Sequence, residues 1–285
     1  MKSFWLALIP LLSVCALAQQ QTSPSDGVMR FALVQHGEGS ARVIAHQARP
    51  LQSALGAVAR EYGWILYFED PPYYSHYDVI DDTDPKWRAS HPAEKGGLRI
   101  AGEAFESQYR EGPDIRSSAG QEAALRSIVS DYNASGNPGK FVVRRMGEGY
   151  AVIGHAVKDE SGRDQEVPAI LDTPISVAPQ TRDPREAVSL ILAALSATTK
   201  RKFVFMSYPQ NIFYSAGQVD FGGKDVPARK LLAQVLDETC SWCFLQWDLL
   251  YDPDSNTFCL HANVAVQART NAQGYTRLVP VRPKQ

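Results

Sequence analysis

Two stretches of this 285-residue chain carry the same order of secondary-structure patterns, and this repetition constrains the fold more than any other feature. In the first stretch, residues 41–46 alternate weakly like a strand, and apolar residues then recur at helical spacing over 51–62. A run rich in β-forming residues follows over 64–68. A second helical pattern over 125–132 precedes a hairpin pattern over 141–153.

The second stretch repeats this order from residue 174 onward. Asp183 followed by Pro184 is typical of a helix start, because an Asp side chain caps free amide groups and Pro fits the first turn. We expect Asp225 to cap the next helix. The predicted elements are a strand at 175–178, a helix at 187–195, strands at 203–206 and 218–221, a helix at 228–236 and a hairpin at 244–260.

The alternation of strands and helices predicts a mixed fold of the α+β or α/β class, with helices packed on short sheets. We expect two tandem small modules of βαβ-βαββ order: module 1 at 41–156 and module 2 at 174–264. Residues 70–97 are predicted to be an insert in module 1. The charged stretch 157–173 is predicted to be a linker, and 265–285 a C-terminal tail.

The first 18 residues have the order of a secretory signal peptide. A short positive start precedes an apolar run at 4–14, about half the ~20 residues that a membrane-spanning helix needs. A small-x-small site ends at Ala18, so we expect cleavage there, a flexible start with a first strand over 19–40, and a periplasmic or secreted protein. A lipoprotein anchored through Cys15 is the alternative. No later segment predicts a transmembrane helix.

The charge balance narrows the class of partner. Lys plus Arg number 29 and Asp plus Glu number 31, which gives a formal net charge of -2. A nucleic-acid-binding protein usually carries a basic stripe, and a membrane-surface protein carries a polybasic segment. The composition therefore favours neither, and we expect no nucleic-acid partner.

Three cysteines remain after the predicted cleavage, and Cys240, Cys243 and Cys259 are disulfide candidates because exported proteins form disulfides. Cys240 and Cys243 form a C-x-x-C pattern, which is also typical of thiol oxidoreductases. Such enzymes place the first Cys at a helix N-terminus, whereas this pair follows the end of a predicted helix. A zinc site with His261 as fourth ligand is a further alternative. The sequence leaves open which cysteines pair.

The chain has none of the short motifs that carry a known catalytic mechanism. It lacks G-x-S-x-G, H-E-x-x-H and the phosphate-binding G-x-x-x-x-G-K, and its six His residues show no ligand spacing. We therefore predict that the protein is not an enzyme, and we assign no catalytic, cofactor-binding or metal-binding residue.

The insert at 70–97 is rich in aromatic residues, and long insertions of this kind are often functional. Aromatic side chains anchor protein interfaces and stack on sugar rings. Tyr73, Tyr74, Tyr77 and Trp87 are therefore candidates for a partner or ligand surface. The alternatives are a solvated loop that covers its own domain, and a calcium site formed by the aspartates of the insert.

Both modules resemble the short N-terminal domain of secretins and TonB-dependent receptors. The resemblance rests on the helix start LQSAL at 51–55 with GWILY at 63–67, and on ARKLL at 228–232 with the hairpin after it. It implies a small periplasmic module that binds other envelope proteins and catalyses nothing. Family members usually precede a pore or a barrel, which does not follow here, so the resemblance implies only the fold and a binding role.

The sequence thus predicts an exported, non-catalytic binding or assembly module of the bacterial cell envelope that contacts a protein partner. Strand edges of the small sheets and the aromatic insert are the expected contact regions. A carbohydrate or small-ligand binder that uses the insert 70–97, and a secreted enzyme of unknown class, are the alternatives. The oligomeric state is not predicted.

Overall fold

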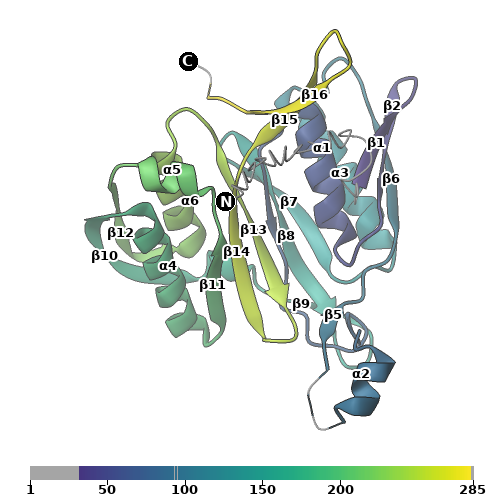
Figure 1. The fold of residues 1–285 in the computed structure, drawn as a ribbon, viewed down its shortest axis with the longest axis vertical. Helices are drawn as coiled ribbons and strands as arrows, with labels where there is room; N and C mark the ends of the chain where they lie inside the picture. The colour runs from purple at the N-terminus through teal and green to yellow at the C-terminus, as the bar shows by residue number, and fades with distance from the viewer. Residues whose placement is uncertain (1–31, 93, 95, 284–285) are drawn as a thin grey trace, which may run out of the picture. The chain divides into compact units, whose positions relative to one another are not determined.

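The two repeated stretches fold into equivalent sets of elements. The computed structural model describes residues 32–283 apart from 93 and 95, and the predicted signal peptide lies outside the described residues. Within this range the fold is mixed α/β, which confirms the predicted class (Figure 1). Module 1 consists of β2 (Ser40–Ala45), α1 (Pro50–Tyr62), β3 (Leu66–Glu69), β6 (Phe105–Arg110), α3 (Ser118–Ala134), β7 (Lys140–Met146) and β8 (Gly149–Lys158). Module 2 consists of β10 (Pro174–Arg182), α4 (Pro184–Thr199), β11 (Lys202–Ser207), β12 (Val219–Pro227), α6 (Ala228–Thr239), β13 (Leu245–Asp252) and β14 (Thr257–Val264).

The remaining helices and strands lie outside the two repeated sets. A short strand precedes module 1, two elements lie in the insert and one directly after it, two lie between the modules, and the others lie within or after module 2. They are β1 (Ala32–His36), β4 (Val79–Asp81), α2 (Pro85–Ser90), β5 (Leu98–Ile100), β9 (Asp164–Glu166), the 3₁₀-helix η1 (Ile170–Asp172), α5 (Gln210–Ser215), β15 (Val266–Thr270) and β16 (Thr276–Pro280).

Local chemistry explains both ends of α1 and the start of α4. α1 starts with Pro50 and ends at Tyr62, and the cap residue Gly63 has a φ of 73° in the left-handed region that glycine adopts without strain. Asp183 caps α4 as predicted, because its side chain accepts a hydrogen bond from the Arg185 amide. The prediction of Asp225 as a cap was wrong, since α6 begins after Pro227 and Asp225 lies within β12.

The strand pairings of the two modules correspond one to one. β2 pairs with β6 antiparallel, as β10 does with β12. β3 pairs with β8 parallel, as β11 does with β14. β7 and β8 form an antiparallel hairpin, as do β13 and β14. Module 2 therefore repeats both the order and the pairing of module 1.

The two modules join in one sheet. Its strand order is β11-β14-β13-β3-β8-β7, with β9 paired to β8, so β3 of module 1 lies beside β13 of module 2. The stretch 157–173, expected to be a linker, contains the end of β8, all of β9 and η1. Leu171 of η1 is fully buried in the core of module 2. This stretch is therefore structured and packed between the modules.

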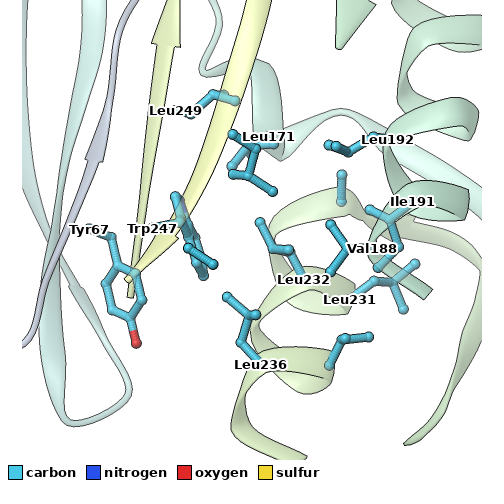
Figure 2. Packing of buried hydrophobic residues seen from close by; sticks show 14 of the residues in the cluster. Tyr67, Leu171, Val188, Ile191, Leu192, Leu231, Leu232, Leu236, Trp247 and Leu249 are labelled. Carbon is cyan, nitrogen blue, oxygen red and sulfur yellow. The ribbon is translucent and has the colours of Figure 1, made fainter. Parts of the chain in front are cut away.

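The helices of the two modules cover opposite faces of this sheet. Leu66 and Phe68 of β3 belong to the core under α1 and α3, whereas Tyr67 belongs to the core under α4 and α6. Neighbouring strand residues point to opposite faces, so the two helix pairs lie on either side. Figure 2 shows Tyr67 and Trp247 side by side from the two modules, facing Leu232 of α6.

The C-terminal residues also fold onto the molecule. The expected tail at 265–285 forms the hairpin of β15 and β16 over most of its described length. The Gln267 side chain of β15 packs against Gly63, at the end of α1. The hairpin therefore belongs to the surface of module 1.

Candidate strand-docking site

The joint between the modules is a short parallel pairing of two sheet edges. Asp248 lies opposite Phe68, and Leu249 lies opposite Glu69. The Asp70 amide then donates to the Leu249 carbonyl at 2.8 Å. The edge of one module thus already accepts a strand of the other.

Asp70 continues this pairing with its side chain. Its buried Oδ2 atom accepts hydrogen bonds from the Tyr251 amide at 3.0 Å and from Arg49 Nε at 2.7 Å. Arg49 also donates to the Tyr251 carbonyl. Burial raises the pKa of Asp70 above its ordinary value, although the Arg49 charge opposes the shift. One carboxylate and one guanidinium therefore satisfy the backbone of β13 beyond the end of β3.

A second buried ion pair ties helix α6 to the same joint. Arg229 of α6 forms an ion pair with Glu69, and Trp247 Nε1 donates to Glu69 Oε1 at 3.2 Å. Arg229 Nε also donates to Asp172 Oδ1 at 2.9 Å. Complete burial raises the pKa of Glu69, while Arg229 and Trp247 lower it. The sequence predictions missed all the charged residues of the joint; the only signal was the acidic pair directly after an apolar strand.

The opposite ends of the shared sheet are free edges. In the described part of the chain, β7 pairs only with β8, and β11 pairs only with β14. Asn133 of α3 closes one end of the β7 edge, because its side chain binds both the amide and the carbonyl of Phe141 at 2.9 Å. Strand alternation makes the backbone groups of Val143 and Arg145 face outward in the same way. Among the described residues nothing is hydrogen-bonded to these outward groups.

Tyr73, one of the four aromatic candidates, is part of the joint and not of a surface. Its side chain is 2% exposed, its hydroxyl donates to Asp70 Oδ1 at 3.4 Å, and its ring lies 6.4 Å from that of Tyr251. The prediction of Tyr73 as a surface residue was therefore wrong. The chain turns inward directly after β3, which carries this ring into the core.

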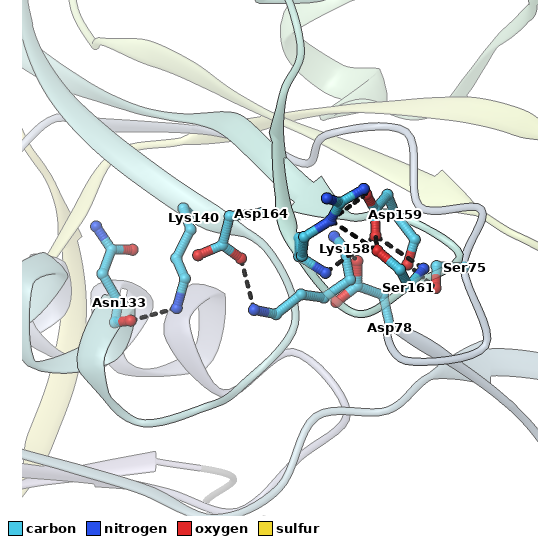
Figure 3. Close-up of polar contacts among 9 residues, drawn as sticks. Ser75, Asp78, Asn133, Lys140, Lys158, Asp159, Ser161 and Asp164 are labelled. Atoms are coloured by element: carbon cyan, nitrogen blue, oxygen red, sulfur yellow. Dashed lines mark hydrogen bonds and ion pairs between the residues drawn. The ribbon is translucent and has the colours of Figure 1, made fainter.

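The start of the insert is anchored to the β8–β9 hairpin (Figure 3). The buried Asp78 carboxylate accepts a hydrogen bond from the Lys158 amide at 2.7 Å. The Ser75 hydroxyl donates to the Asp159 carbonyl at 3.0 Å, and Lys158 forms an ion pair with Asp164 at 2.7 Å. These contacts hold the first part of the insert in a defined position.

The other three aromatic candidates, Tyr74, Tyr77 and Trp87, do not form one common surface. Tyr74 is 46% exposed and Tyr77 is 51% exposed. The Tyr74 hydroxyl donates to Gln165 at 2.7 Å, and the Tyr77 ring packs on Gly162, so both lie on the β8–β9 hairpin. Trp87 lies on α2 and stacks on His91, with ring centroids 4.7 Å apart. The geometry gives no single stacking surface for a sugar ring.

The structure resolves the open cysteine pairing. Cys240 and Cys243 form a disulfide directly after the C-terminal end of α6, and both are buried. Cys259 carries a free thiol on β14. The described residues contain no group of three or more His, Cys, Asp or Glu side chains that would hold a metal ion.

Cys259 and His261 line a cavity of about 290 Å³ together with Arg49 and Arg99. Burial raises the pKa of the Cys259 thiol and lowers that of His261, whose Nδ1 lies 2.8 Å from the Ser207 hydroxyl. Both shifts favour the neutral forms, whereas a nucleophilic cysteine needs a thiolate. The cavity therefore lacks the electrostatics of a cysteine enzyme.

Comparisons with protein-family models, curated proteins and solved structures found no match for this chain. Among the described residues, no helix combines the length and the apolar character that crossing a membrane requires.

Proposed function

We propose that the protein is an exported, non-catalytic binding or assembly module of the cell envelope that docks a protein partner along a free sheet edge. The observation that carries the proposal is the joint itself: β3 accepts β13 as a neighbouring strand. The same type of module presents a further edge at β7, where backbone groups face outward. Edge-strand addition gives affinity through main-chain hydrogen bonds.

Three features support a binding role over catalysis. The predicted signal peptide and the resemblance to domains of secretins and TonB-dependent receptors favour an envelope module. The buried carboxylates of the joint, Glu69 and Asp70, are held by arginines and are not free for acid–base chemistry. The free thiol of Cys259 is kept in its neutral form by burial.

The proposal is tested by blocking the β7 edge with proline, which lacks a backbone N–H and is tolerated on edge strands. Arg145→Pro removes an outward amide of the β7 edge. Arg110→Pro is the matched control, because Arg110 is an exposed residue at the end of another edge strand, β6. The mature chain is immobilised, partners are captured from an envelope extract, and the affinity of each identified partner is measured.

Arg145→Pro is expected to weaken partner binding at least about tenfold, equivalent to roughly 1.4 kcal/mol, whereas Arg110→Pro leaves it unchanged. Circular dichroism and thermal melting check that both variants stay folded. Equal binding by the two variants, or no partner captured by the wild-type chain, contradicts the proposal.

A further inference from the structure

We propose that a second copy of this chain occupies the free edges: β11 of one copy pairs with β7 of the next, which repeats the β3·β13 joint between molecules. The inference rests on the proposed function, because it names the partner of the same edges. It makes the protein a head-to-tail assembling subunit.

The register of the sheet shows that these edges are the counterparts of the joint. In module 1, Phe68 lies opposite Val152, which lies opposite Val143. In module 2, Phe205 lies opposite Leu260, which lies opposite Leu249. β7 is therefore the counterpart of β13, and β11 is the counterpart of β3. The internal joint therefore pairs β3 with β13, while their counterparts β11 and β7 each keep a free edge.

The groups used in the joint have free counterparts. The joint uses the carbonyl of Leu249 and both the amide and the carbonyl of Tyr251. Their counterparts on β7 are Val143 and Arg145, whose outward groups have no hydrogen-bond partner among the described residues. In the joint, backbone binds the Leu249 carbonyl, whereas the side chains of Asp70 and Arg49 bind Tyr251. The Val143 carbonyl is therefore the group that the backbone of an incoming strand would bind.

The β11 edge leaves an apolar side chain in water at the docking position. Glu69 follows Phe68 on β3 and is fully buried in the joint. A β-bulge between Phe205 and Ser207 puts Ser207 at the position that corresponds to Glu69, and the bulged Met206 is 56% exposed. Pairing with β7 would place Met206 against the β7 edge and remove part of this apolar surface from water.

Strand directions allow the pairing without rotating the incoming copy. β7 runs antiparallel to β8, and β8 runs parallel to β3, so β7 is opposite to β3. β11 runs parallel to β14, which is antiparallel to β13, and β13 is parallel to β3. β11 and β7 therefore run in the same direction. A copy shifted along the sheet presents β11 parallel to β7, as β13 is to β3.

This contact is heterologous, so it builds a chain of copies and not a closed two-fold dimer. Each copy adds the six strands of the main order, and strands lie ~4.8 Å apart, so successive copies are expected to be roughly 29 Å apart along the sheet. The twist of the sheet makes the assembly helical. Its formation depends on concentration.

A pair of cysteine variants tests the contact in the full mature chain. The joint register, transferred to the free edges, places Val142 opposite Phe205. A β-bulge between Phe205 and Ser207 then brings Ser207 next to Val143 and Arg144. Arg144 and Ser207 are both exposed, and neighbouring strands bring Cα atoms within disulfide range. Arg144→Cys and Ser207→Cys are made separately in a Cys259→Ser background and mixed under mild oxidation. A mixture of Arg110→Cys with Ser207→Cys is the control.

The Arg144→Cys and Ser207→Cys mixture is expected to give a disulfide-linked pair of chains, while each variant alone and the control mixture stay single. In sedimentation velocity, the wild type should form larger species as its concentration rises, and Arg145→Pro should stay monomeric. Cross-linking of Arg144→Cys with itself would show a symmetric edge dimer and overturn the head-to-tail contact.

The failure of this inference differs from the failure of the proposed function. If no mixture cross-links but a different envelope protein binds in a manner lost on Arg145→Pro, the edge function stands and the second copy is rejected. If neither cross-linking nor partner capture occurs, both are rejected.

Discussion

At the scale of single residues, the joint depends on buried carboxylates that are paired with arginines. Asp70 binds the Tyr251 amide and Arg49, while Glu69 binds Arg229 and the Trp247 indole. Buried ions destabilise a fold unless they are paired and hydrogen-bonded, so each pair acts as a unit. Removing one member leaves the other charge uncompensated between the modules.

The Glu69–Arg229 pair gives a direct test of this dependence. Arg229→Met is expected to lower the free energy of unfolding by about 3 to 5 kcal/mol, because it strands a buried carboxylate. The double variant Glu69→Gln with Arg229→Met should recover most of the loss, since no charge remains and the Trp247 hydrogen bond is kept. Urea unfolding at neutral pH measures both.

Arg126→Met serves as the matched control for the Arg229 variant. It removes an exposed pair with Glu122 on the surface of α3 and should change stability by no more than about 0.5 kcal/mol. If Arg126→Met and Arg229→Met lose similar free energies of unfolding, or if the double variant recovers none of the loss, the buried pair contributes no more to stability than an exposed pair.

Asp248 makes stability depend on pH. It pairs with Phe68 in the joint, and burial raises its pKa from 3.8 to about 6, while a hydrogen bond with Gln52 opposes the shift. The folded state therefore holds this proton more tightly than the unfolded state. The stability that protonated Asp248 contributes is present below pH 3.8 and is lost as the pH rises to about 6. Asp248→Asn should be more stable than the wild type by about 1 to 3 kcal/mol at pH 8, and the difference should vanish near pH 4. Urea unfolding at both pH values checks this, and a constant difference contradicts it.

At the scale of elements, the sequence predicted the repeated core well because periodicity reports burial directly. The stripe at 51–62 became α1, and the hairpin patterns became β7–β8 and β13–β14. Periodicity does not show which strand will pair with a predicted strand. The run at 64–68 predicted a strand, but whether its edge lies in water or against β13 is decided by residues about 180 positions away.

In the insert and the expected linker, aromatic content and charge led to wrong predictions of which residues are exposed and which are unstructured. Tyr73 and Tyr74 are adjacent and chemically identical, yet one is buried on Asp70 and the other is half exposed. The charges of the expected linker pair locally, as in Lys158 with Asp164, and so allow an ordered hairpin. Composition describes the solvation of a side chain on average, whereas its position depends on a long-range contact.

At the scale of the whole molecule, the shared sheet makes one core depend on both modules. Tyr67 and Ile153 of module 1 lie in the same apolar cluster as Trp247 of module 2. Separating the modules would expose this surface on both sides. The repeat therefore encodes two similar units, while the edge pairing makes them one cooperative structure.

We accordingly expect a single unfolding transition, and reciprocal core variants test it. Phe141→Ala removes a buried ring from module 1, and Phe258→Ala removes one from module 2. Each should lower the free energy of unfolding by about 3 to 5 kcal/mol. Either change should shift the transition of the whole chain, because the cluster around Trp247 cannot persist without β3. Unfolding is followed by far-UV circular dichroism and by tryptophan fluorescence, to which Trp242 and Trp247 contribute in module 2. In both variants the two probes should give the same urea midpoint. If Phe141→Ala shifted the circular dichroism while the fluorescence of module 2 kept its wild-type midpoint, the modules would unfold independently and the β3·β13 pairing would contribute little to stability.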